Sequence, residues 1–155
     1  MRLTDLLTIN HIKIPVESTQ RDKVIKELVD QVPDQVNDIQ QAYDAVMERE
    51  KIMTTGVGNG IAIPHCKHHS CPDFVIVLGI SDKQIDFNAI DNKKVNLIFL
   101  LLGPENNPGM HIKLLSRISR LMSDENFRNK LCQSETAENA YALIKEQEAV
   151  FPEIE

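Results

Sequence analysis

The sequence predicts an α/β fold in which helices cover both faces of a sheet. Two apolar runs of strand length, 74–80 and 95–102, indicate central strands that are buried on both faces. Apolar residues at helical spacing occur before and after these runs. The 155 residues are expected to form a single domain, 1–155, whose core needs neither a disulfide nor a metal.

The first forty residues are expected to contain one short strand and one amphipathic helix. Ile9, Ile12 and Ile14 suggest the strand. Thr19, with Asp22 three residues later, forms a weak capping-box pattern, so we expect Thr19 to cap a helix. Pro33 is expected to stop that helix, because proline lacks the N–H that the next turn requires.

A second helix is expected to begin near Asn37 or Asp38. Its apolar stripe is Ile39, Ala42, Tyr43, Val46 and Met47. Arg49 extends this stripe near the end of the helix, and the spacing directs it towards the core side. A charged group in that position needs a partner or a function.

The second half of the chain completes the predicted sheet and its outer helices. Residues 84–87 alternate between polar and apolar, as in a strand. Asn107-Pro108 is typical of a helix start, with an N-cap followed by proline at the first helical position. His111 then lies in the first turn, on the inner face, and two more helices are expected over 124–132 and 137–148.

Composition excludes several functional classes. The net charge of -6 opposes nucleic-acid binding, which depends on Lys and Arg neutralising phosphates. No apolar run approaches the roughly 20 residues that span a bilayer, and no signal-peptide pattern opens the chain. A cytoplasmic protein without direct membrane insertion is expected. The odd cysteine count favours reduced thiols; the three residues are Cys66, Cys71 and Cys132.

His65 is the leading candidate for a reactive residue. Pro64 has a fixed φ and biases Ile63 towards an extended backbone, so the imidazole is presented from a stiff strand end. A histidine with an ordinary pKa of about 6.5 is mostly neutral at pH 7 and keeps a nucleophilic lone pair. Imidazole is also a leaving group, which suits reversible phosphoryl transfer. The alternative is a structural histidine that caps a strand.

Glycines at 56, 58 and 60 precede this histidine and are candidates for a phosphate-binding loop. Glycine permits positive φ and close backbone approach, so several N–H groups can face one anion. The loop matches neither a Walker motif nor a dinucleotide fingerprint. The alternative interpretation is a flexible connection between a helix and a strand.

His111 and Arg49 are candidates for binding the phosphoryl oxygens. A histidine in a first helical turn, directly after an apolar strand, lies where α/β sheets form a crevice and where anions are favoured. Arg49 can hold two oxygens at once. The alternatives are a core histidine bonded to a carbonyl and an arginine that neutralises the end of its own helix.

The run of histidines and cysteines at 65–71 raises two other hypotheses. It suggests a metal-binding module, because His and Cys are the usual zinc ligands, but the ligands are crowded and no second cluster completes a site. A Cys66 nucleophile with His65 as base is disfavoured, because adjacent residues on an extended chain point to opposite faces. We therefore expect no metal and no cofactor, with His68 and His69 in a solvent-facing loop.

These residues resemble the enzyme IIA component of the bacterial phosphoenolpyruvate-dependent phosphotransferase system (PTS), mannitol/fructose class, which includes nitrogen-regulatory paralogues. The matching signature positions are Glu50, Val57, Gly58, Ile61, Ala62, Ile63, Pro64, His65 and Cys66. The resemblance implies a three-layer α/β/α sandwich with a central mixed sheet. It also implies phosphorylation of His65, with Arg49-Glu50 and His111 as further active-site residues.

The same resemblance implies the partners. The phosphoryl group is expected to come from the phosphocarrier HPr or a nitrogen-branch HPr paralogue. A regulatory, nitrogen-type IIA would then bind regulated target proteins, whereas a sugar-transport component would pass the group to a cysteine on an enzyme IIB domain. The absence of fused IIB or IIC segments favours the regulatory hypothesis, and the transport hypothesis stays open.

Overall fold

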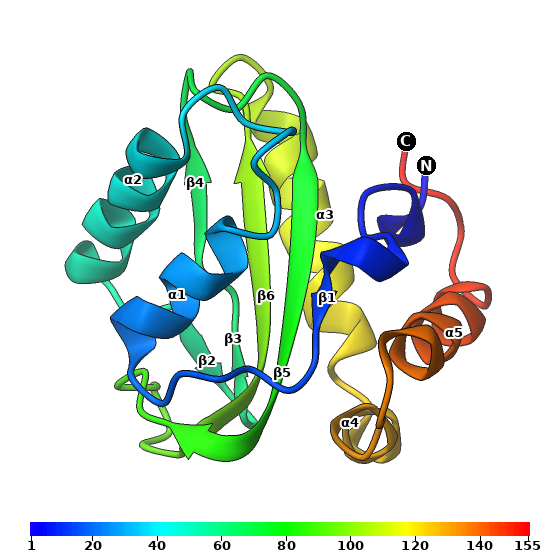
Figure 1. Ribbon diagram of the computed structural model, residues 1–155. Coiled ribbons are helices and arrows are strands. Elements are labelled where there is room, and N and C mark those ends of the chain that lie inside the picture. The colour runs from blue at the N-terminus through cyan, green and yellow to red at the C-terminus, as the bar shows by residue number, and fades with distance from the viewer.

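The computed structural model describes residues 1–155 as a three-layer α/β/α sandwich with a mixed sheet (Figure 1). Helices α1 and α2 cover one face, and α3, α4 and α5 lie on the other. The strands are β1 (Ile12–Lys13), β2 (Gly56–Gly58), β3 (Ile61–Ala62), β4 (His65–Lys67), β5 (Val75–Ile85) and β6 (Val95–Gly103). The helices are α1 (Arg21–Val29), α2 (Ile39–Ile52), α3 (Pro108–Leu121), α4 (Glu125–Cys132) and α5 (Ala137–Glu148), with 3-10 turns η1 (Leu3–Asp5) and η2 (Ile9–His11).

The sheet is organised around β6. Its order is β1-β5-β6-β3-β2, with β5 and β6 antiparallel and with β3 and β4 both parallel to β6. Ile61 is paired with Leu97, and His65 with Leu101, so the chain runs along β6 on both sides of Pro64. This pairing fixes His65 at the start of β4, between the helical layers.

The core lies on both faces of the sheet, which confirms the prediction of buried central strands. One cluster of 21 buried residues lies on the α1–α2 side and another of 20 on the α3–α5 side. Alternate residues of β5 belong to opposite clusters: Val75 and Val77 face the first, and Ile76 and Leu78 the second. Because both faces of each strand are covered, β5 and β6 need apolar residues at almost every position.

The predicted starts of the later helices are confirmed. Asp38 caps α2 by accepting from the N–H of Gln41, and Asn107 caps α3 by accepting from the N–H of Met110. Helices α4 and α5 occupy the predicted ranges 124–132 and 137–148. No helix combines the length and the apolar content that crossing a bilayer requires.

The prediction for the start of α1 is wrong. The N-cap residue is Gln20, not Thr19, and no side chain caps this helix. Gln20 forms an isolated parallel bridge with Asp86 and has an extended backbone, so the helix begins one residue later than a Thr19 cap requires. It also ends at Val29, before Pro33 is reached.

Two predicted strands have different bounds in the structure. In 9–14, only Ile12–Lys13 is strand, because the N–H of His11 bonds to the carbonyl of Thr8 and closes a 3-10 turn. The strand expected over 84–87 is the end of β5, which continues to Ile85 through a register irregularity. A single long strand therefore replaces two shorter ones.

Candidate phosphoryl-transfer site

A cavity of about 440 Å³ lies between α2, β4 and α3. His65, His111 and Arg49, which the sequence indicated separately, all line it. Other lining residues are Ile52, Lys67 and Ile112. One residue from each of three elements thus contributes to the predicted site. The rest of the wall is largely apolar, with one base, Lys67, and one acid, Glu48.

The ring of His65 is held in one orientation by the backbone. Its Nδ1 lies 2.8 Å from the carbonyl oxygen of Ile63. A carbonyl oxygen only accepts hydrogen bonds, so Nδ1 carries the proton and donates it. Nε2 then keeps its lone pair, and the half-buried ring presents a nucleophilic nitrogen.

His111 approaches this ring from the first turn of α3. The two ring centroids are 5.4 Å apart, with the planes tilted by 54°. His111 is only 2% exposed, and neither of its ring nitrogens has a hydrogen-bond partner in the protein. Buried polar side chains are normally hydrogen-bonded, so an unpartnered imidazole beside a cavity indicates a ligand-binding group.

Gly103, the last residue of β6, makes room for the ring of Phe74, which packs beside His111. A Cβ at this position would lie 3.4 Å from Nδ1 of His111 and 2.5 Å from the ring of Phe74. A contact of 2.5 Å is far inside van der Waals range, so any side chain here would displace the Phe74 ring. Phe74 packs beside His111, with centroids 6.2 Å apart, so Gly103 affects His111 through Phe74.

Both histidines are neutral at pH 7. Burial lowers the pKa of His65, as do the charges of Arg49 and Lys67, against the opposing effects of the Ile63 hydrogen bond and Glu50. Burial also lowers the pKa of His111 to about 4, assisted by His65 and Lys67. A neutral His65 can attack phosphorus, and a neutral His111 can donate one N–H to a phosphoryl oxygen.

Arg49 and Lys67 give the cavity positive charge. Arg49 is half-buried, not directed into the core, and its Nη1 donates to the carbonyl of Met53, 3.0 Å away. The remaining guanidinium donors are available to an anion. Lys67 lies two residues after His65 in β4, so the strand places both on the same face. Against the single carboxylate of Glu48, these two cations leave the lining with a net positive charge, which suits an anionic group although the chain is acidic.

The buried member of the Arg49-Glu50 pair is the acid. Glu50 is 2% exposed, and its carboxylate accepts hydrogen bonds from the N–H and the hydroxyl of Thr55. The sequence pattern placed the arginine on the core side; the helix places the glutamate there instead. The core-side prediction for Arg49 is therefore wrong, although Arg49 lines the cavity.

The three glycines lie outside this cavity. Gly56 is close to Ala89, where a Cβ would be 2.9 Å from the Ala89 backbone, and Gly58 and Gly60 have φ of 102° and 79°. Gly60 precedes His65 by five residues of extended chain, roughly 16 Å. The structure explains these glycines by close packing and by a tight β2–β3 turn, and it does not bring them to the histidines.

The residues of 65–71 point in different directions. Cys66 is buried beneath α2, with Sγ 3.9 Å from the carbonyl of Ala42, and its pKa is raised by its contact with Cys71 and by burial. His68 bonds to Ser70 and partly lines the cavity. No group of three His, Cys, Asp or Glu side chains is arranged to hold a metal ion.

The family model for the phosphoenolpyruvate-dependent sugar phosphotransferase system, EIIA 2, matches residues 5–147. The chain belongs to this EIIA family. Domains of the family are phosphoryl-transfer proteins, which agrees with a neutral histidine in a basic cavity.

Relatives of this EIIA domain come from both sugar-transport and regulatory branches. The fructose-specific EIIABC component of Bacillus subtilis is 33% identical over 96% of this chain, which spans only 24% of that protein. The nitrogen regulatory protein of Pseudomonas aeruginosa is 32% identical over 93% of this chain and 95% of its own. The fructose-specific EIIA component of Haloferax volcanii is 35% identical over 94% of this chain and 98% of its own.

Solved structures confirm the EIIA fold. The nitrogen regulatory protein IIA-Ntr of Neisseria meningitidis has a TM-score of 0.87 and 28% identity, covering 92% of this chain and 98% of its own. The mannitol IIA of Escherichia coli has a TM-score of 0.77 and 16% identity, covering 88% of this chain and 97% of its own. At that identity, the second similarity is evidence for the fold alone.

Sequence reasoning missed several residues of the EIIA cavity. Lys67 carried a signal, since it lies two positions from His65 on a strand. Gly103, which is not in the lining but accommodates Phe74 beside His111, carried only the weak signal of a glycine after an apolar run. Ile52 and Ile112 carried none, because each is an exposed residue, 78% and 63% accessible, whose importance depends on the helix opposite.

Proposed function

We propose that this EIIA domain accepts a phosphoryl group on Nε2 of His65 from the phosphohistidine of HPr or a nitrogen-branch HPr paralogue. The observation that carries the proposal is the hydrogen bond from Nδ1 of His65 to the carbonyl of Ile63, which leaves Nε2 as the free nitrogen. The charges of Arg49 and Lys67 and the unpartnered imidazole of His111 support it.

The transfer exchanges one N–P bond for another. The Nε2 lone pair of His65 forms the new bond, the donor's N–P bond breaks, and its electron pair returns to the donor imidazole. Nδ1 keeps its proton, and the Ile63 carbonyl stabilises the positive charge that the ring gains. Arg49 and His111 bind the equatorial oxygens, so apart from the attack by His65 the protein supplies positioning and charge stabilisation.

Ile52 and Ile112 suit this cavity to a protein partner. They lie on α2 and α3, on opposite sides of the cavity, and both are largely exposed. Exposed apolar side chains around a polar reaction site are typical of a contact surface for another protein. Such a surface supports direct transfer between two proteins.

The test uses phosphoenolpyruvate, enzyme I and the matching carrier with the intact chain. Mass spectrometry is expected to detect one acid-labile phosphoryl adduct, which His65→Ala abolishes and His69→Ala retains. His69 is a matched control, because it lies four residues away and is exposed. An adduct that survives in His65→Ala would assign the phosphoryl group to another residue.

For the branch, we propose a regulatory, nitrogen-type protein that binds target proteins according to its phosphorylation state. The structural likeness to IIA-Ntr supports this, whereas the fructose-specific relatives support a transport component that passes the group to a IIB cysteine. The test adds candidate IIB domains to the phosphorylated chain. Rapid discharge to a sugar-specific IIB would contradict the regulatory assignment.

A further inference from the structure

A chain of hydrogen bonds connects the last turn of α2 to the ring of His65. The N–H of Thr55 donates to the Glu50 carboxylate at 2.8 Å, and the hydroxyl of Thr55 donates to the same group. The carbonyl of Thr55 accepts from the N–H of Ile63 at 3.0 Å. The carbonyl of Ile63 accepts from Nδ1 of His65 at 2.8 Å. Every step between the carboxylate and the reactive ring is therefore a direct contact.

Burial of the Glu50 carboxylate is energetically unfavourable. It is 2% exposed, and no basic side chain forms an ion pair with it. A buried carboxylate lowers stability unless hydrogen bonds satisfy it, and the two Thr55 donors fill that role here. An apolar residue at this position of α2 would be simpler for packing alone, so the charge calls for a functional explanation.

The first two links fix the backbone between α2 and the phosphorylation site. Thr55 follows the end of α2 and precedes β2, and Glu50 holds it against the helix that it has just left. The bond from Ile63 to Thr55 continues the antiparallel pairing of β2 with β3, next to the pair of Gly56 and Ala62. Together they set the position of the Ile63 carbonyl.

The last link selects the tautomer of His65. A neutral imidazole can carry its proton on either nitrogen, and a well-placed acceptor at Nδ1 holds it there. Pro64 has no N–H, and its rigid ring keeps the Ile63 carbonyl and the His65 ring in a fixed relation. If the carbonyl moved away, the proton would also occupy Nε2 and block the nucleophile.

We propose that Glu50 and Thr55 are positioning residues that, through Ile63, hold His65 in the Nδ1–H tautomer with Nε2 directed to the phosphoryl group. The proposal deepens the proposed function and rests on it for its purpose. Glu50 touches neither the ring nor the phosphoryl group and acts only through this chain. Its negative charge also favours the positive ring that phosphorylation creates, as its effect on the pKa of His65 indicates.

The test measures the tautomer directly by 15N NMR of the His65 ring, together with the rate of transfer. The wild type is expected to show the Nδ1–H form alone. Glu50→Ala should show a mixture of tautomers and a transfer rate lower by about tenfold to a hundredfold, the cost of a misplaced reacting group. Asp44→Ala is the control, since it removes an exposed carboxylate from the same helix.

A conservative variant separates positioning from charge. Glu50→Gln keeps an acceptor for the Thr55 N–H, so the Nδ1–H tautomer should survive. The pKa of the His65 ring in this variant should fall below that of the wild type, because a nearby negative charge has been removed. Glu50→Asp keeps the charge but shortens the side chain by one methylene, and it should reproduce the mixed tautomers even if Glu50→Ala fails to fold.

The proposal is overturned if folded Glu50→Ala or Glu50→Asp retains the pure Nδ1–H form. Failure of the proposed function is a different result, in which the wild-type chain acquires no phosphoryl adduct from the carrier. The tautomer is measured without any partner protein, so the two outcomes are independent.

Discussion

Helix α3 carries two buried polar side chains in opposite circumstances. His111, in its first turn, is 2% exposed and has no hydrogen-bond partner in the protein. Arg117, six residues later, is 8% exposed and pairs with Glu148 at 2.8 Å. One helix therefore carries an unsatisfied group at a cavity and a satisfied group within the packed structure.

The Arg117 end is a dense polar network. The carboxylate of Glu148 is fully buried and also accepts from the N–H of Leu3 at 2.8 Å. Arg117 donates to the carbonyl of Pro152, and its guanidinium lies 5.6 Å from the centre of the Phe151 ring. The network joins segments from both ends of the chain, which lie side by side in Figure 1.

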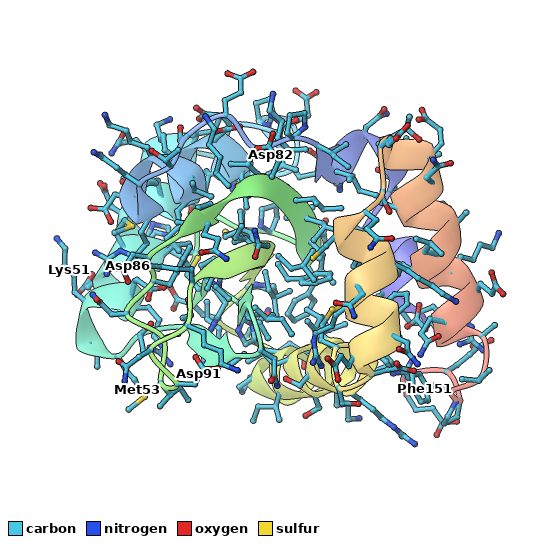
Figure 2. All side chains as sticks on the ribbon, turned by 90° about the horizontal axis from the view of Figure 1, so that it is seen from below. Lys51, Met53, Asp82, Asp86, Asp91 and Phe151 are labelled. Atoms are coloured by element: carbon cyan, nitrogen blue, oxygen red, sulfur yellow. The ribbon has the colours of Figure 1, made fainter.

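The two arginines near these regions show the same contrast. Arg117 packs over Phe151, whereas Arg49 bonds to the carbonyl of Met53 and leaves its other donors towards the cavity. Figure 2 shows Phe151 and Met53 on opposite sides of the molecule. Arg117 uses both Nη atoms within the protein, on a buried carboxylate and a backbone carbonyl, whereas Arg49 uses one, which leaves more of its donors available to a ligand.

The largest expected effect is on stability, from Glu148→Ala. Removing one partner of a buried ion pair leaves Arg117 as an uncompensated charge, which costs about 3 to 5 kcal/mol. Urea unfolding should show this loss in the free energy of unfolding, while the folded protein should still accept phosphate on His65. Glu146→Ala, at an exposed position of the same helix, should change stability by less than about 0.5 kcal/mol. A small effect of Glu148→Ala would show that the network adds little.

The second expected effect is on function, from His111→Leu. One charge-assisted hydrogen bond to a phosphoryl oxygen is worth about 1.5 to 3 kcal/mol, so transfer should slow by roughly 10- to 150-fold. Stability at pH 7.5 should stay within about 1 kcal/mol of the wild type, because an unsatisfied polar group is replaced by an apolar one. Rapid-quench measurement of the adduct gives the rate. Wild-type transfer by this variant would remove His111 from the site.

Local features of the sequence predicted the helices best. The start of α2 near Asn37 or Asp38 and the cap at Asn107 were predicted, because each cap depends on a side chain and an N–H three residues away. Thr19 was wrongly assigned because the start of α1 depends on a bridge between Gln20 and Asp86, which are far apart in sequence. Interactions of that range leave no local pattern.

The same distinction applies to the candidate site. His65 was predictable from Pro64 beside it, and His111 from its place after a helix cap. The burial of Glu50 was not, because it depends on how the chain folds back after α2. The spacing of the glycines suggested an anion-binding loop. Gly56 is instead required by close packing against Ala89, which is distant in sequence.

The smallest expected effect is a pH dependence of stability, and it separates the two ends of α3 without affecting the ion pair. The pKa of His111 is about 4 in the folded protein and about 6.5 when the chain is unfolded. Between pH 4 and pH 6.5 the unfolded chain binds a proton at His111 that the folded chain does not. The free energy of unfolding therefore has its full value above pH 6.5 and declines as the pH falls towards 4.

From pH 7.5 to 5.5 His111 should therefore cost the wild type about 1 kcal/mol of unfolding free energy, and His65, whose pKa is also lowered, adds to the loss. Urea unfolding at pH 7.5, 6.5 and 5.5 measures it. His111→Leu should have a shallower dependence than the wild type, because its residue 111 has no proton to bind. Glu148→Ala should keep the wild-type contribution of His111 despite its lower stability. Parallel curves for wild type and His111→Leu would show that the imidazole of His111 is already protonated, or already partnered, in the folded protein.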